Sequence, residues 1–145
     1  MAVHTTADKL TIGRGGFPSI GPKVGLIQAT VDLVTLVSAN DYADVFALPA
    51  GTLVLNMGIE VVVATSNGVT VSLGLDGSGA GSRTEFSGEL ATNGAAGTKL
   101  SAGYTKANVV LTAADIISAE ISGPPGAALA QIRVWAVIAD INDMA

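Results

Sequence analysis

The sequence predicts an all-β protein, an antiparallel β-sandwich of the jelly-roll type with seven to eight strands and an extended N-terminal arm. Apolar and polar residues alternate with a period of two through most of the chain, and short clusters of turn-forming residues separate these runs. Apolar residues nowhere recur at helical spacing for more than a turn or so. With 145 residues the chain has the size of one domain. A small closed barrel is the alternative arrangement of the same strands.

Residues 1–23 are rich in glycine and proline and have no sustained apolar period. We therefore expect them to form the arm, and residues 24–145 to form the sandwich domain. The arm carries three basic residues against one acidic residue, a net charge of +2, so the total of −5 leaves −7 on the domain. An acidic body repels nucleic acid, and the arm has too few charges to bind it alone.

Each alternating run predicts one strand with an apolar and a polar face. The runs lie at residues 24–37, 45–48, 53–63, 69–75, 108–112, 116–122 and 130–141. Turns are expected at Asn40 with Asp41, at residues 49–51 (PAG) and at residues 123–126 (GPPG), because these residue types favour turn conformations.

Asn67 and Gly68 stand between two alternating runs. This pair predicts a β-hairpin with a type I′ turn, since both central positions of that turn need a positive φ. Residues 76–97 predict a long glycine-rich loop, interrupted at most by a short strand around residues 84–90. Loops of this length inside a compact domain are uncommon unless they have a task.

The composition excludes several classes of protein. The absence of cysteine removes disulfides and thiolate catalysis. No stretch approaches the ~20 consecutive apolar residues of a membrane-spanning helix, so no membrane partner is expected. Only 13% of the residues are charged, well below the share near a quarter that is usual for soluble domains. The shortfall indicates that other subunits cover part of the surface.

Residue types for catalysis are scarce. The single histidine, His4, lies in the expected arm, where a rigid triad could not form. Asp41 with Asp44, and Glu85 with Glu89, are close enough in sequence to suggest paired carboxylates, but we expect them to be solvated turn and loop charges.

A glycine-rich stretch at residues 76–81 begins like a calcium-binding or phosphate-binding loop. It lacks the further acids and closing glutamate of the first and the helix and lysine of the second. No catalytic, cofactor or metal site is therefore predicted, and the chain is not expected to be an enzyme.

Two strands are expected to present apolar side chains on their polar faces. Alternation from Gln131 and Arg133 places Trp135 on the outer face of the last strand, where Trp and Arg favour protein contacts. The alternative is that Trp135 lies under the arm or in the second half of the core. Val54 and Val62 fall on the polar side of their strand in the same way. These faces, and long strands without lysine or proline to block edge pairing, predict a homo-oligomer, with a trimer as the hypothesis.

Several segments resemble one family of proteins. They are residues 44–52 (DVFALPAGT) with the strand that follows, 107–112 (ANVVLT), 117–123 (ISAEISG) and 133–140 (RVWAVIAD). Over residues 42–140 the chain resembles small virion proteins of tailed bacteriophages, the capsid decoration or cement proteins in particular. The resemblance rests on the phrasing of strands and turns and carries no catalytic signature.

The resemblance implies a homotrimer on the exterior of the phage capsid, made in the host cytoplasm and bound to the lattice of the major capsid protein, which it would stabilise. The arm, with Arg14 and Phe17, would then reach across the capsid or to a neighbouring subunit, and residues 76–97 would point outward. Two alternatives stay open: a tail, fibre or minor capsid subunit, and a lectin-like sandwich in which Tyr42, Tyr104 or Trp135 stacks on a sugar.

Overall fold

The computed structural model describes residues 3–11, 23–76, 86, 89–101, 109–127 and 129–141, with the backbone alone for 3–11, 23 and 109. In these ranges the chain forms ten strands and one short 3-10 helix at Leu33–Thr35. The strands are β1 (Val3–Thr11), β2 (Lys23–Asp32), β3 (Tyr42–Leu48), β4 (Thr52–Val63), β5 (Thr70–Leu75), β6 (Leu90–Ala91), β7 (Lys99–Ser101), β8 (Val109–Val110), β9 (Asp115–Ile121) and β10 (Gln131–Asp140).

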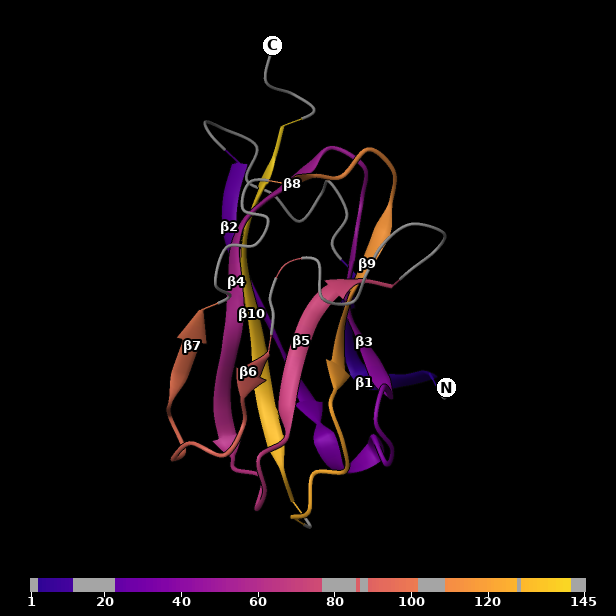
Figure 1. Ribbon diagram of the computed structural model, residues 1–145. Coiled ribbons are helices and arrows are strands. Elements are labelled where there is room, and N and C mark those ends of the chain that lie inside the picture. Colours follow the sequence, from indigo (N-terminus) through magenta and orange to yellow (C-terminus); the bar gives the residue numbers. More distant parts are fainter. Residues whose placement is uncertain are drawn as a thin grey trace.

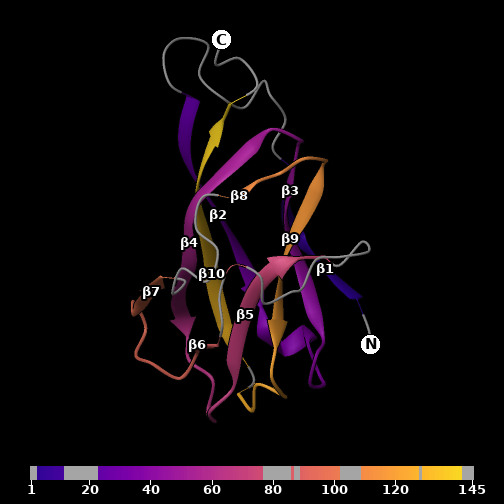
Figure 2. The same cartoon turned by 45° about the horizontal axis from the view of Figure 1, so that its top comes forward.

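The strands build two sheets packed face to face, as Figure 1 shows with one sheet on the left and the other on the right. One sheet has the order β2-β10-β4-β7, with β8 also paired to β4, and the other has the order β1-β3-β9-β5-β6. Figure 2 shows the same two layers from a second direction. The prediction of an all-β sandwich is confirmed.

The pairing pattern is that of a jelly roll. β2 pairs with β10, β3 with β9, β4 with β7 and β8, and β5 with β6, all antiparallel. These are nested pairs, as if one long hairpin had been folded over so that successive pairs fall in alternate sheets. The predicted jelly-roll type is therefore confirmed, with ten strands in place of the expected seven to eight because β1 and the short β7 add to the count.

β10 holds one sheet together. All ten of its residues pair with β2 on one side and with β4 on the other. Its burial alternates between buried and half-buried over most of its length. The period of two in its sequence therefore marks a strand with one face in the core and one face outside.

The core lies between the sheets and is built almost wholly of aliphatic side chains. Its largest fully buried members are Phe46, Leu33, Leu36, Met57, Ile59, Leu73, Ile117, Ile121, Ile132, Ile138, Val31 and Val45. These side chains come from the inward faces of both sheets, so packing the two sheets face to face buries them together.

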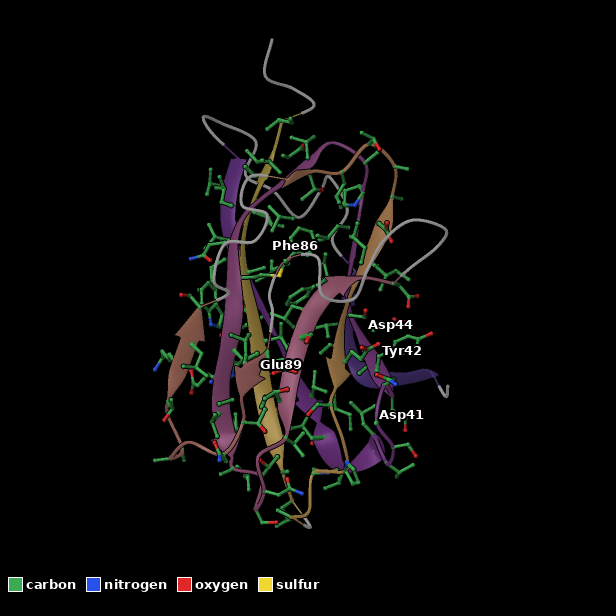
Figure 3. All side chains as sticks on the ribbon, in the orientation of Figure 1. Asp41, Tyr42, Asp44, Phe86 and Glu89 are labelled. Carbon is green, nitrogen blue, oxygen red and sulfur yellow. The ribbon has the colours of Figure 1, made fainter. Side chains whose placement is uncertain are left out.

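The predicted long loop at residues 76–97 contains a core contact. Phe86 is buried in the core cluster, and its backbone N–H donates to the Leu73 carbonyl over 3.0 Å. Figure 3 shows Phe86 between the two sheets. A strand follows at Leu90–Ala91, just beyond the expected position, while residues 77–85 and 87–88 lie outside the described residues.

Two β-bulges in β4 change which residues face outward. Val137 and Ile138 of β10 are adjacent, but their partners Asn56 and Val54 are two residues apart, so Leu55 is an extra residue in β4. The bulge turns Val54 into the core, where its side chain is 2% exposed. The prediction that Val54 lies on the outer face is therefore wrong. A second bulge at the other end of β4 leaves Val62 half-buried.

The predicted Asn67-Gly68 hairpin is wrong. β4 and β5 lie in different sheets, and neither Asn67 nor Gly68 has the positive φ of a type I′ turn. The segment instead crosses the sandwich and is tied to neighbouring loops. The Asn67 side chain donates to the Pro124 carbonyl at 3.0 Å. Asn67 therefore connects this segment to the loop between β9 and β10, because its side-chain amide is hydrogen-bonded to a residue that is distant in sequence.

The first long strand is shorter than expected. Residues 24–37 were expected as one strand, but β2 ends at Asp32 and the chain turns through the 3-10 helix. The expected turn at Asn40 is present, with a φ of 70°. Asp41 accepts hydrogen bonds from the backbone N–H groups of Val37 and Ser38, both at 3.0 Å.

Asp41 and Asp44 are both buried, so the expectation that they are solvated charges is wrong. Figure 3 shows the two residues with Tyr42 at the start of β3. For Asp41 the reason is the turn itself, since two backbone donors need an acceptor beneath the surface.

Part of the expected arm belongs to a sheet. Residues 3–11 form β1, which lies parallel to β3 at the edge of the second sheet, with an irregularity between Thr5 and Leu10. Parallel pairing with a distant strand leaves no local sequence signal, which explains the difference. Residues 12–22 lie outside the described residues. No helix in the described ranges is long and apolar enough to cross a membrane.

Replacing Thr92 with valine tests the crossing segment. The Thr92 hydroxyl is fully buried, donates to the Val69 carbonyl at 2.6 Å and lies 2.9 Å from the Thr65 hydroxyl. Thr92→Val keeps the shape and removes both contacts of the hydroxyl. The Val69 carbonyl still accepts from the Thr92 backbone N–H at 3.3 Å, and the Thr65 hydroxyl still donates to the Asn67 carbonyl at 3.0 Å. We therefore expect the free energy of unfolding to fall by about 0.5–1.5 kcal/mol, the net value of a hydrogen bond. Chemical denaturation measures this, with the exposed Thr112→Val as control. Equal stability of the two variants would contradict the role given to the hydroxyl.

Candidate assembly surfaces

The outer face of the β2-β10-β4-β7 sheet carries the residues singled out for contacts. Gln131, Arg133, Trp135 and Val137 of β10 alternate with its buried residues and are half-buried. The structure thus places Trp135 on the outer face of the sheet, as alternation predicted, and outside the core.

Trp135 lies over a glycine of the neighbouring strand. Gly58 of β4 is its direct cross-strand partner. A Cβ atom at Gly58 would lie 2.6 Å from Cζ2 of the Trp135 ring and would also collide with the Leu100 carbonyl oxygen. The glycine therefore makes room for the ring to lie flat against the backbone, which fixes the largest side chain of this face in one position.

A small charge cluster lies beside the tryptophan. Glu60 on β4 accepts a hydrogen bond from Arg133 at 3.1 Å, and its other oxygen is 3.7 Å from the Lys99 ammonium group on β7. Lys99 is largely exposed, so these ion pairs contribute at most about 1 kcal/mol to stability. Their main effect is to orient Arg133 across the face, with one positive charge in excess.

Beyond Trp135 the same face becomes apolar. Leu26 and Val24 on β2 pair with Val137 and Ala139, and they are 65% and 48% exposed. These two residues were not singled out from the sequence. The signal was present, because Val24 and Leu26 fall in the same alternating set as the polar Gln28.

One end of the sandwich is hollowed. The hollow has a volume of about 310 Å³ and is lined by Asp32, Val34, Val63, Leu129 and Gln131. The Gln131 amide donates to the Asp32 carboxylate at 2.6 Å, which closes one wall. Three of the five lining residues are partly or largely exposed aliphatic side chains, so the hollow suits an apolar group.

The outer face of the other sheet is polar. Tyr42, Glu120 and Ser72 form one cross-strand row, and Asp44, Ser118 and Gly74 form the next. Tyr42 is buried, so it offers no stacking platform for a sugar. A hollow of about 180 Å³ beside these rows is lined by Asn40, Thr70, Ser72, Glu89, Glu120, Ile121 and Ser122.

The described residues contain no group of three or more histidine, cysteine or acidic side chains that could hold a metal ion. Several residues considered from the sequence lie outside the description. They are Arg14, Phe17, Glu85, Tyr104, residues 77–81 and the side chain of His4. The surfaces that remain offer shape, apolar area and a few oriented charges, which suits binding to another protein.

No protein-family model and no curated protein matches the sequence. Solved structures do match. A chain in the capsid of Ralstonia phage GP4 matches with a TM-score of 0.69 at 19% identity, over 96% of this chain and 98% of that one. The chain has a fold found in bacteriophage capsids.

Two further structures share this capsid fold. A chain in the cyanophage Pam1 capsid asymmetric unit matches with a TM-score of 0.67 at 19% identity, over 84% of this chain and 89% of that one. A chain in the acid-stable capsid of Helicobacter pylori bacteriophage KHP30 matches with a TM-score of 0.61 at 16% identity, over 80% and 86%. The agreement spans strands of both sheets in all three, because no single sheet accounts for four fifths of the chain.

Gly58→Ala tests the contact between Trp135 and its partner strand. The added Cβ must displace the Trp135 ring or the β7 backbone, so we expect a loss of about 1–3 kcal/mol in the free energy of unfolding. Gly25→Ala in β2 is the matched control, because a Cβ there meets nothing within 4 Å. Near-ultraviolet circular dichroism reports the tryptophan and denaturation reports stability. Two equally stable variants with unchanged tryptophan spectra would contradict the packing described.

Proposed function

We propose that the chain is a virion structural protein of a tailed bacteriophage, a homotrimeric decoration or cement protein on the exterior of the capsid. The observation that carries the proposal is the fold shared with chains of three bacteriophage capsid structures over at least 80% of this chain. In this role the protein binds the lattice of the major capsid protein and adds contacts across subunit boundaries.

The extent of the match supports an accessory subunit. The Ralstonia phage chain is covered over 98% of its length, so it too is a single jelly roll with almost nothing added. A chain of this size presents one face to a partner lattice and leaves the other side free. That geometry suits a protein that sits on a shell built by larger subunits.

The surface chemistry supports the same role. The outer face of the β2-β10-β4-β7 sheet combines the fixed Trp135, the oriented Arg133 and the exposed Leu26. Burying apolar surface yields roughly 25 cal/mol per Å², less the cost of ordering the partners. A lattice repeats this modest gain at every subunit boundary, so weak single contacts stabilise the whole shell.

The proposed contact residues are Arg14 and Phe17 in the segment before β2, and Val62, Arg133 and Trp135 on the outer face. Val54 no longer belongs with them, because the bulge at Leu55 directs it into the core. The exposed Val24 and Leu26 of β2 replace it among the proposed contact residues of this face.

Capsids that lack this protein provide the main test. The purified chain should sediment as a trimer, bind such capsids to saturation and raise the temperature at which they open. A cryo-EM map should then place the added density outside the shell. Binding to tails instead would favour the tail or fibre alternative, and binding to glycans without binding to particles would favour a lectin. A stable monomer at micromolar concentration would remove the trimer.

A double substitution tests the segment before β2. Because β1 is part of a sheet, deleting residues 1–23 would disturb the fold, so point changes are preferable. Arg14→Ala with Phe17→Ala should weaken capsid binding by at least about tenfold if both are anchors. Ser19→Ala is the control in the same segment. Unchanged affinity with an unchanged circular dichroism spectrum would contradict this role.

A further inference from the structure

The chain contains an Asn-Gly pair at Asn67-Gly68 and another at Asn93-Gly94. The backbone nitrogen that follows an asparagine can attack the carbon of its side-chain amide and close a five-membered ring. Glycine hinders this attack least, because it has no Cβ atom. Both asparagines are exposed, so water reaches both sites. The sequence chemistry is the same at the two pairs, and the local structure decides which of them reacts.

The first pair stands in open surroundings. A Cβ atom at Gly68 would meet no atom within 4 Å, and the Gly68 N–H donates a hydrogen bond to no described residue. The Thr65 hydroxyl donates to the Asn67 carbonyl at 3.0 Å, and this carbonyl belongs to the same peptide unit as the Gly68 nitrogen. A hydrogen bond to that oxygen favours the negatively charged peptide that forms when the nitrogen loses its proton. The attacking nitrogen is therefore both accessible and activated.

The second pair is held more tightly. A Cβ atom at Gly94 would lie 3.1 to 3.3 Å from three side-chain atoms of Thr98. The loop is also fixed to β4, because the Gly97 N–H donates to the Val61 carbonyl and the Val61 N–H donates to the Thr98 carbonyl, both at 2.8 Å. Ring closure needs a rotation of the peptide after the asparagine, which moves the Cα atom of the glycine. That movement is open at the first pair and opposed by Thr98 at the second.

We propose that Asn67 is a site of spontaneous covalent modification, at which the Gly68 nitrogen displaces the side-chain amide as ammonia. The N–Cγ bond forms, the Cγ–Nδ2 bond breaks, and the ammonia carries away the proton of the Gly68 N–H. The product is a cyclic imide. Water then opens the ring at either of its carbonyl carbons, so the final product is aspartate or isoaspartate. Water is the only other reactant.

The product breaks a contact that the structure depends on at this point. The Asn67 side-chain amide donates to the Pro124 carbonyl at 3.0 Å, whereas a carboxylate has no hydrogen to donate. Two acceptors would then face each other. The neighbouring loop is also close, because a Cβ atom at Gly126 would lie 2.8 Å from Asn67 Nδ2 and 2.6 Å from Ser66 Oγ. Isoaspartate adds a methylene group to the backbone in this tight contact, so the modification loosens the connection between the β4–β5 segment and the β9–β10 loop.

This inference goes beyond the proposed capsid role and does not depend on it. It concerns the intact chain alone, and its test uses purified protein without capsids. A failure here would therefore leave the proposed function untouched.

The two pairs serve as an internal comparison. The purified chain is incubated in warm, mildly alkaline buffer and digested with trypsin at intervals. Cleavage after Lys23, Arg83 and Lys99 separates the two sites, and mass spectrometry with isoaspartate detection follows each one. We expect Asn67 to convert at least about tenfold faster than Asn93 in the folded chain, and the two rates to become equal in concentrated urea. Asn93 converting as fast as Asn67 in the folded chain would overturn the proposal.

Gly68→Ala tests the attacking nitrogen. The added methyl group has room, and the φ of Gly68 is not positive, so the fold should be unchanged by circular dichroism. We expect conversion of Asn67 to slow by at least about tenfold, because the new side chain hinders the attack. After the same incubation, the parent chain should unfold at a lower temperature than before it, and the variant should not. Equal conversion in the variant and the parent would overturn the proposal.

The consequence for the contact is tested with Asn67→Asp, which supplies one product directly. We expect this variant to unfold at a lower temperature than the parent chain, because the bond to Pro124 is lost. Asn93→Asp is the matched control, since it makes the same change at an exposed asparagine of the other pair. Equal unfolding temperatures for the two variants would overturn the effect assigned to the modification.

Discussion

The double pairing of β10 is the interaction on which the rest of this structure depends. β10 contributes ten residues to ladders on both of its sides, with β2 from the start of the domain and β4 from its middle. Its inward residues Ile132, Val134 and Ile138 complete the core. The outermost of the nested pairs joins β2 to β10, so the last strand must return along the chain to an early one. Contacts of such long sequence separation cost loop-closure entropy before they yield burial, and folds of this kind form slowly.

Much of the fold could be predicted from the period-two alternation of apolar and polar residues. It located β10, β9 and β5 to within a residue or two, and it placed Trp135 outside the core. It failed where a single residue changed the phase. The bulge at Leu55 reverses the faces of β4, and nothing in a run of alternating apolar residues reveals an extra one.

Other features depend on partners that local sequence does not name. Asn67 with Gly68 has the composition of a hairpin turn, but its amide bonds to Pro124, far along the chain. Asp41 and Asp44 look like surface charges and are buried. β1 pairs in parallel with β3, and no residue near β1 in the sequence indicates this pairing. On the candidate surface, the position of Gly58 in the middle of β4 was the sequence feature that could have indicated the close approach of the Trp135 ring.

The low charge of the sequence acquires a location in the structure. The charged residues described on the β2-β10-β4-β7 face lie toward the Gln131 end of β10, while the half formed by Val24, Leu26 and Val137 carries none. The shortage is therefore concentrated on one area, where a partner can cover it.

The register of β2 with β10 also has a mechanical consequence. Lys23 pairs with Asp140, so the first residue of β2 and the last residue of β10 lie side by side in one ladder. A force that pulled these ends apart would load one backbone pair at a time and peel β2 from β10 like a zipper. A force on the sandwich faces would load many bonds in parallel. The β2–β10 ladder therefore gives way most easily to tension applied at Lys23 and Asp140.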